Sequence, residues 1–322
     1  MKNLIIICLL FSGSISISQA QSFREEEVLL DVENGTLGGI VMYPETKKKT
    51  PVVLIIQGSG PTDKDGNSAS IPGKNNSLKM LAESLAEAGI ASLRFDKRGQ
   101  GMSQSAAIPE SDLTFDTFVE DAKAWLNSLI VNKKFTKVGV VGHSQGSLIG
   151  MLISRDADVS AFASLAGPSL NISETILNQI KGNPNNPESI IKEAQDIMSS
   201  INKGETVDNI PSYYASLFRP SIQPFMRSWM KYNPQTAFKK LSIPSIVING
   251  TTDIQVSMDD ADRLHAANPK SKKYIIDGMN HVLKNAPQDV QQNMATYGNP
   301  DLPLNPDFSM LFVAFFKENL QK

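Results

Sequence analysis

The chain has 322 residues, of which 20% are charged and 41% hydrophobic, and its formal net charge is -2. This is the composition of an ordinary globular protein with a sizeable core, which excludes a disordered or fibrous chain and gives no reason to expect a nucleic-acid partner. One cysteine and three histidines exclude a disulfide framework and a cysteine-based zinc site, and they argue against any histidine-rich metal site, so no metal is expected.

The first twenty residues have the layout of a secretory signal peptide. Lys2 gives a positive start, an apolar run covers residues 4–11, and Ser18-Gln19-Ala20 fits a cleavage site of small residues. The apolar run is too short to span a bilayer as a helix. Cys8 lies inside this run rather than at its end, which argues against a lipid anchor. We therefore expect residues 1–20 to be removed and the protein to be secreted or periplasmic, without a stable membrane anchor.

From residue 21 to residue 169, short apolar runs alternate with segments of helical spacing, which indicates one structural unit. Such an alternation predicts a mostly parallel sheet with helices on both faces, an α/β fold. The expected strands are residues 52–56, 90–95, 137–141 and 159–165, and the expected helices are residues 78–88, 115–129 and 145–154.

Residues 170–238 differ from the rest because they are polar, compatible with helix and punctuated by proline, without a buried-strand pattern. Strand patterns return at 245–249 and 273–276, so residues 239–322 complete the sheet and the middle is an insertion. An insertion after the strand at 159–165 leaves the sheet where ligands bind in open α/β folds. We expect it to be a lid; the alternative is a helical subdomain that only packs on the body.

The chemical signal is Gly142-His143-Ser144-Gln145-Gly146, which joins a predicted buried strand to a predicted helix. A Gly-x-Ser-x-Gly pattern alone is weak, but at a strand-to-helix turn it predicts a nucleophilic serine on a sharp, strained elbow. Ser144 is therefore the candidate nucleophile. The helix that follows points its backbone N–H groups and its positive dipole end at the same place.

A serine hydroxyl needs a base, and only three histidines are available. His143 sits in the elbow itself, and His265 lies in a charged helical stretch. His281 follows the last predicted strand by a short loop, so it is chosen by elimination and by position. The carboxylate that orients it is expected to be Asp253, in the loop after the strand at 245–249, and Asp277 is the rival.

The developing oxyanion needs donors. One is the backbone N–H of Gln145, the residue after the nucleophile. The other is expected in the loop Gln57-Gly58-Ser59-Gly60-Pro61 after the strand at 52–56. Its glycines let the backbone turn an N–H inwards, and we favour Ser59, with Gly58 as the alternative. The loop lacks the spacing of a phosphate-binding motif.

With these motifs in place, the chain resembles α/β-hydrolases over residues 26–169 and 239–320. More narrowly, it resembles secreted or cell-envelope esterases grouped with the S33-type serine aminopeptidases, which residues 218–225 of the insertion also resemble. The segments that carry the likeness are residues 57–63, 94–103, 142–146, 250–253 and 280–281.

The resemblance implies a carboxylester hydrolase with an acyl-enzyme mechanism, a small-molecule ester as substrate and no cofactor. One departure concerns the oxyanion loop: many relatives have His-Gly where this chain has Gln57-Gly58. The backbone donor survives that change, but the hydrogen bond that anchors the loop is expected to differ.

Several residues keep two interpretations. Asp96, Arg98 and Ser103 are interpreted as structural rather than substrate-binding. In the insertion, the aromatic residues Phe225 and Trp229 are candidates for an acyl pocket, and packing onto the body is the equal alternative.

The alternatives to an esterase are a peptidase on the same three residues and, further off, a non-catalytic binding protein. A peptidase would need an anchor for a free amino terminus, such as Glu188, Glu193 or Asp196, and these form no tight cluster. The sequence identifies neither the acyl group nor the alcohol, and it leaves the oligomeric state open.

Overall fold

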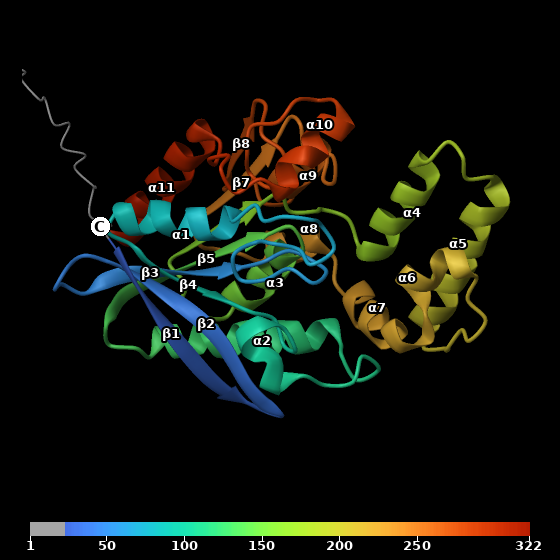
Figure 1. Ribbon diagram of the computed structural model, residues 1–322, viewed down its shortest axis with the longest axis horizontal. Coiled ribbons are helices and arrows are strands. Elements are labelled where there is room, and N and C mark those ends of the chain that lie inside the picture. Colours follow the sequence, from blue (N-terminus) through green and yellow to red (C-terminus); the bar gives the residue numbers. More distant parts are fainter. Residues whose placement is uncertain (1–22) are drawn as a thin grey trace, which may run out of the picture.

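The architecture is an eight-stranded sheet with helices on both faces, shown in Figure 1 by a computed structural model that describes residues 23–322. The predicted leader at 1–20, with Cys8, lies outside the described residues. The strand order is β1-β2-β4-β3-β5-β6-β7-β8, antiparallel for β1–β2 and β2–β4 and parallel elsewhere. The strands are β1 (Phe23–Val32), β2 (Gly35–Pro44), β3 (Thr50–Ile56), β4 (Ala91–Phe95), β5 (Phe135–His143), β6 (Ala161–Leu165), β7 (Ser245–Gly250) and β8 (Lys272–Ile276).

The N-terminal hairpin of β1 and β2 was not predicted. The two strands pair in full register and turn at Asn34 and Gly35, both of which have positive φ values, 66° and 138°. Asn-Gly is a strong hairpin signal, and β1 alternates exposed and part-buried residues along its length. The Asn-Gly signal was present in the sequence and could have identified the hairpin.

Helices cover both faces of the sheet. They are α1 (Ser77–Glu87), α2 (Phe115–Ile130), α3 (Gln145–Ser154), α4 (Ile172–Gly182), α5 (Glu188–Lys203), α6 (Ala215–Phe218), α7 (Gln223–Met230), α8 (Pro234–Lys239), α9 (Met258–Ala267), α10 (Val290–Ala295) and α11 (Pro306–Leu320), with 3₁₀ turns at Gly101–Ala106, Ser212–Tyr214, Pro220–Ile222 and Thr296–Gly298. One apolar cluster packs α1 and α11 on the sheet, and a second packs α2, α3, α8 and α9 on it. Figure 1 shows α1 and α11 on one side of the sheet and α2 on the other.

The helices α4–α8 lie between β6 and β7 in the chain, and we refer to them as the helical insertion (Ile172–Lys239). The apolar side chains of α4–α7 form a cluster of their own, which includes Ile176, Met198 and Phe218, whereas α8 packs on the sheet. Figure 1 shows α4–α7 to one side of the sheet. The insertion meets the body through α7, where Trp229 stacks on Phe115 of α2 with ring centres 5.4 Å apart.

Candidate active site

The turn between β5 and α3 is held in a conformation that only its glycines permit. Ser144 has φ 53° and ψ -122°, values that a non-glycine residue rarely adopts and that cost on the order of 1–3 kcal/mol. A Cβ on Gly142 would lie 2.1 Å from the carbonyl oxygen of Gly146, and a Cβ on Gly146 would lie 2.4 Å from the carbonyl oxygen of Ile56. The strand and the helix therefore approach closely only because both positions are glycine.

Ser144 and the start of α3 face the same space. The Ser144 amide donates to the carbonyl of Leu165, 2.9 Å away, which ties the turn to β6. The N–H groups of the first helical turn have no acceptor within the helix. The backbone N–H of Gln145 is the first of these, beside the Ser144 hydroxyl and at the positive end of the helix dipole.

Asp253 and His281 form a buried pair after β7 and β8. His281 Nδ1 lies 2.9 Å from Asp253 Oδ2, and the side chain of Asp253 is fully buried. The other oxygen of Asp253 accepts the backbone N–H groups of Gln255 and Val256 at 2.8 and 3.0 Å. Burial raises the pKa of this carboxyl, but His281 and the two amides outweigh it, so the pKa is lowered overall. Asp253 is therefore ionised at neutral pH and holds the imidazole with a proton on Nδ1.

The rival residues occupy other places. Asp277 is exposed, and its Oδ1 accepts the hydroxyl of Thr251 at 3.1 Å. His265 lies on α9, where its Nδ1 is 3.1 Å from the hydroxyl of Ser271. The structure thus brings Asp253 to His281 and leaves Asp277 and His265 outside the pair.

His143 lies under the pair. It is buried, its Nε2 is 2.7 Å from the backbone carbonyl of His281, and the two imidazole rings are 4.8 Å apart. A carbonyl only accepts, so His143 carries its proton on Nε2. Burial, reinforced by His281, lowers the pKa of His143 to about 3. His143 is therefore a neutral donor that fixes the backbone of His281.

This buried neutral histidine predicts acid lability. In the unfolded chain its pKa returns to about 6.5, so between about pH 3 and 6.5 the unfolded state binds one more proton. The corresponding stability is complete above pH 6.5 and is lost as the pH falls, by up to about 1.4 kcal/mol per pH unit. His143→Gln keeps an N–H donor but cannot titrate. Urea unfolding of both proteins from about pH 7 to 4.5 should show a shallower decline for the variant; parallel curves would refute the assignment.

The candidate nucleophile and the candidate base are not joined by a hydrogen bond. Among the hydrogen bonds of residues 23–322, none links the Ser144 hydroxyl to His281. Ser144 follows β5 and His281 follows β8. His143, the neighbour of Ser144, bonds to the backbone carbonyl of His281 at 2.7 Å and so connects the two loops. In proteins without substrate such a bond is often long and shortens when substrate binds.

The predicted oxyanion loop after β3 is anchored from below by two side chains. Gln57 is buried, and its Nε2 donates to the carbonyl of Phe95 at 2.9 Å. With glutamine in place of histidine at residue 57, the sequence left open how this loop is anchored. The bond from Gln57 to Phe95 is that anchor. The Lys97 ammonium donates to the carbonyls of Gly58 and Gly60 at 2.5 and 2.9 Å. Sequence reasoning missed Lys97, because nothing in the pattern around it shows where its side chain points.

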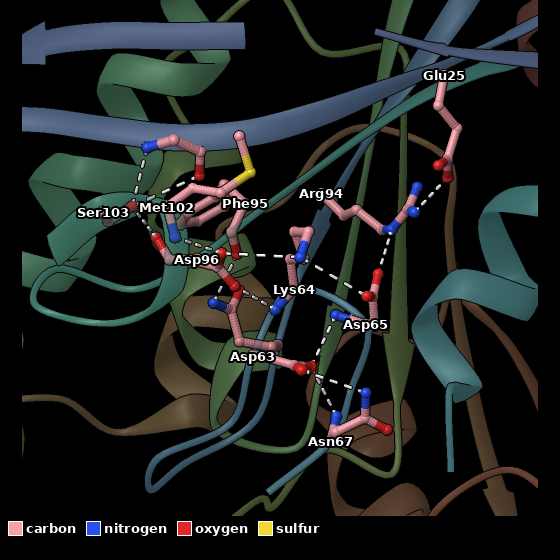
Figure 2. A network of polar contacts seen from close by, with 12 residues as sticks. Glu25, Asp63, Lys64, Asp65, Asn67, Arg94, Phe95, Asp96, Met102 and Ser103 are labelled. Carbon is pink, nitrogen blue, oxygen red and sulfur yellow. Dashed lines mark hydrogen bonds and ion pairs between the residues drawn. The ribbon is translucent and has the colours of Figure 1, made fainter. Parts of the chain in front are cut away.

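The rest of this long loop is held by the network in Figure 2. Arg94 donates to Asp65 at 2.7 Å and to Glu25 at 2.5 Å. Asp96 accepts the backbone N–H groups of Lys64 and Met102 at 2.9 and 3.0 Å. The loop is thereby fastened to β4, to the turn that follows it and to β1.

Two further residues of this turn also bond within the fold. The Ser103 hydroxyl donates to the Asp96 carbonyl at 2.7 Å. Arg98 donates to both carboxylate oxygens of Asp121, at 3.0 and 2.5 Å. The side chains of Asp96, Arg98 and Ser103 thus hold the loop, the turn and α2 together, which is a structural role.

A cavity of about 660 Å³ opens between the body and the helical insertion. Ser59, Ser144 and Gln145 line its floor. Its walls are mostly apolar, from both the body and the insertion, and include Phe118, Leu148, Ile176, Leu217, Phe225 and Trp229. Phe225 also packs edge-on against Phe118, with ring centres 5.5 Å apart. Phe225 and Trp229 thus face the cavity and pack the insertion onto the body, so both interpretations describe them.

Acidic groups are sparse in this cavity. Glu110 is the acidic residue that lines it, and this carboxylate is bonded to Arg219, at 3.0 Å from Nε, and to the Ser221 hydroxyl at 2.5 Å. These bonds lower the pKa of Glu110. The carboxylates considered for a peptidase do not line the cavity: Glu188, Glu193 and Asp196 lie on α5, where Glu193 accepts the hydroxyl of Tyr213 and Asp196 pairs with Lys192.

Residues 23–322 contain no group of three or more histidine, cysteine, aspartate or glutamate side chains placed to hold a metal ion. In the same range, no helix has the length and apolar character needed to cross a membrane.

Comparison with known proteins gives consistent likenesses. The sequence model of the family described as "Serine aminopeptidase, S33" matches residues 74–288, which is more than half of the chain. Esterase EstD of Thermotoga maritima is 26% identical over 272 residues, which are 82% of this chain and 61% of that protein. The chain thus spans about three fifths of the length of this relative.

Solved structures support the same architecture. Est1E from Butyrivibrio proteoclasticus matches with a TM-score of 0.59 and 18% identity, over 92% of this chain and 99% of that one. The Pyrococcus furiosus esterase Pf2001 matches with a TM-score of 0.58 and 17% identity, over 93% of each chain. At such identities the likeness concerns the fold.

Proposed function

Because the chain belongs to the serine aminopeptidase S33 family and has the α/β-hydrolase fold, as the sequence predicted, we propose that it is a serine hydrolase that cleaves carboxylic esters through an acyl-enzyme. The observation that carries the proposal is the buried Asp253–His281 pair, 2.9 Å apart, whose His281 carbonyl is bonded to His143, the neighbour of Ser144 on the strained elbow. Esterases among both the sequence relatives and the structural neighbours support the reaction class.

In this mechanism the Ser144 hydroxyl attacks the ester carbonyl, and His281 Nε2 takes its proton. Asp253 stays ionised and stabilises the imidazolium that forms. The backbone N–H groups of Gln145 and Ser59 stabilise the oxyanion of the tetrahedral intermediate. His281 then protonates the leaving alcohol. Water, activated by His281, releases the acid and restores the Ser144 hydroxyl.

The helical insertion acts as a lid that forms the acyl pocket. The cavity wall that it contributes is mostly apolar, and at about 660 Å³ the space exceeds what an acetyl group fills. Phe225 and Trp229 form the aromatic part of that wall. The substrate is therefore a small-molecule ester with an extended or bulky apolar acyl group.

Phe225→Leu tests this acyl pocket. We expect kcat/KM for p-nitrophenyl octanoate, relative to the acetate, to fall by about tenfold, because an aromatic contact to the longer chain is lost. The matched control is Phe238→Leu, since Phe238 packs on Phe162 in the body and does not line the cavity. Both variants should lose on the order of 1–2 kcal/mol of stability. Equal octanoate-to-acetate ratios in the two variants would show that Phe225 only packs.

A peptidase on the same residues is the second candidate, and the description of the family is what favours it. It is weaker because a free amino terminus needs an unengaged carboxylate in the cavity, and Glu110 is bonded to Arg219 and Ser221. A non-catalytic binding protein ranks lower still, since it has no need of the buried Asp253–His281 pair.

The test is a rapid-mixing experiment with p-nitrophenyl butyrate. We expect a burst of p-nitrophenol equal to the enzyme concentration, and a butyryl group found by mass spectrometry on the peptide that carries Ser144. Aminoacyl p-nitroanilides, assayed in parallel, give the peptidase reading if they are cleaved faster than any ester. If neither substrate class is hydrolysed above the uncatalysed rate, the proposal fails.

We also propose that the protein is secreted or periplasmic and that residues 1–20 are its leader. The support is the sequence layout of Lys2, the apolar run and Ser18-Gln19-Ala20. The intact mass of the exported protein decides the matter, since a chain that still contains residue 1 would contradict it.

A further inference from the structure

Lys97 is a buried cation with unusual partners. Its side chain follows β4, is 6% exposed, and donates to the backbone carbonyls of Gly58 and Gly60. The ammonium lies 5.6 Å from the centre of the Phe118 ring, and no ion pair of the described chain includes Lys97. The charged groups nearest in the chain are engaged elsewhere, because Asp96 accepts amides of the loop and Arg98 binds Asp121. In the part of the chain that the structure describes, the hydrogen bonds of the Lys97 side chain go to these two carbonyls.

The carbonyl of Gly58 belongs to the same peptide unit as the N–H of Ser59. A trans peptide is planar, so its C=O and its N–H point in opposite directions. With the carbonyl bonded to Lys97 on the buried side, the N–H of Ser59 is directed to the other side of the unit. On that side lies the cavity, where Ser59 and Ser144 both contribute to the lining.

We propose that Lys97 is a positioning residue that orients the Ser59 N–H as the second oxyanion donor. The inference rests on the proposed function and chooses Ser59 over Gly58, whose own N–H belongs to the preceding peptide unit. Gly60 O, the second acceptor, belongs to the peptide between residues 60 and 61, so Lys97 also holds the backbone that follows Ser59.

The restraint does not depend on the charge state of the lysine. Burial lowers the pKa of Lys97 to about 7. A neutral amine still has two N–H bonds, enough for two carbonyls. The loop is therefore held on both sides of neutral pH, and the role is geometric.

Lys97→Met removes both donors and keeps the length of the side chain. Loss of an oxyanion donor typically lowers kcat by about 10²- to 10³-fold. A misdirected donor should do less, so we expect kcat for p-nitrophenyl butyrate to fall by about 10- to 100-fold while KM stays within about twofold. The inhibition constant of a trifluoromethyl ketone, whose adduct with Ser144 carries the oxyanion, should rise by the same factor as kcat/KM falls.

Arg94→Met is the matched control. Arg94 is a buried cation, 1% exposed, that anchors the same loop through Asp65 and does not touch the peptide between residues 58 and 59. If Lys97 merely stabilises the loop, the two variants should lose activity alike. If it orients the Ser59 N–H, Arg94→Met should lower the thermal midpoint but keep kcat within about threefold. Equal losses of kcat, or an unchanged kcat in Lys97→Met, would overturn the proposal.

Rescue keeps the test decisive should Lys97→Met fail to fold. Cys8 is the single cysteine of the chain, so Lys97→Cys in a Cys8→Ser background has one thiol. Alkylation in denaturant with 2-bromoethylamine forms an S–C bond with loss of bromide and gives a side chain of lysine length. After refolding, the protein alkylated with 2-bromoethylamine should recover most of the wild-type kcat. The protein alkylated with iodoethane should not. Equal kcat for the two alkylated proteins would refute the role.

These results are distinguishable from failure of the proposed function. Wild-type protein without Ser144-dependent hydrolysis would remove the reaction itself. An active wild-type protein whose Lys97 variants keep kcat would remove only the positioning role.

Discussion

Replacing Ser144 by alanine is expected to lower kcat for ester hydrolysis by about 10⁴- to 10⁶-fold, the range seen when a serine hydrolase loses its nucleophile. The reason is that no other hydroxyl sits on the turn beside His281 and the start of α3. The hydroxyl makes no hydrogen bond within residues 23–322, so its removal leaves no partner unsatisfied and the free energy of unfolding should change by less than about 1 kcal/mol. Burst kinetics and urea unfolding measure the two effects.

Ser59→Ala is the matched control for this prediction. It removes a hydroxyl from the same cavity but leaves the backbone N–H in place, so kcat should stay within about threefold. Loss of activity in both serine variants would show that the Ser59 hydroxyl, rather than its backbone, takes part. Full activity in Ser144→Ala would end the acyl-enzyme proposal.

Asp253→Asn is the second substitution with a large expected effect, a fall in kcat of about 10³- to 10⁴-fold. The backbone N–H groups of Gln255 and Val256 donate to one oxygen of this side chain. In the variant they select the amide oxygen for that place and turn the NH₂ group toward His281 Nδ1. The imidazole must then accept at Nδ1 and carry its proton on Nε2, where it cannot take the proton of Ser144.

Asp277→Asn is the control, because Asp277 accepts the hydroxyl of Thr251 and is exposed. We expect its kcat to remain within about threefold of the wild type. Steady-state kinetics of the two variants decide between the two aspartates. A larger loss in Asp277→Asn than in Asp253→Asn would reverse the assignment.

Patterns that repeat locally were predictable from the sequence. The alternation of apolar strands with helices predicts the parallel sheet. The spacing of Gly142, Ser144 and Gly146 identifies the elbow, because the close approach of strand and helix admits no side chain at either glycine. The pairing of Asp253 with His281 follows from strand ends that meet at one edge of a sheet.

Contacts between residues that are far apart in the sequence were not predictable. Lys97 reaches a loop almost forty residues earlier in the sequence, and no periodicity records that. Phe225 both lines the cavity and packs against Phe118. This arrangement depends on how the apolar cluster of the insertion meets that of the body. The hairpin of β1 and β2 was missed for a different reason, since its Asn34-Gly35 turn is a local signal that was not used.

The placement of the helical insertion has a consequence for how such a protein can diversify. β6 and β7 are hydrogen-bonded neighbours, so the insertion leaves the sheet and re-enters it side by side. The entropy of closing such a loop changes by only about 0.6 kcal/mol when its length doubles, and most of the insertion packs on its own cluster. Selection can therefore lengthen, shorten or replace this segment and change the wall of the cavity while the sheet and its elbow are inherited unchanged.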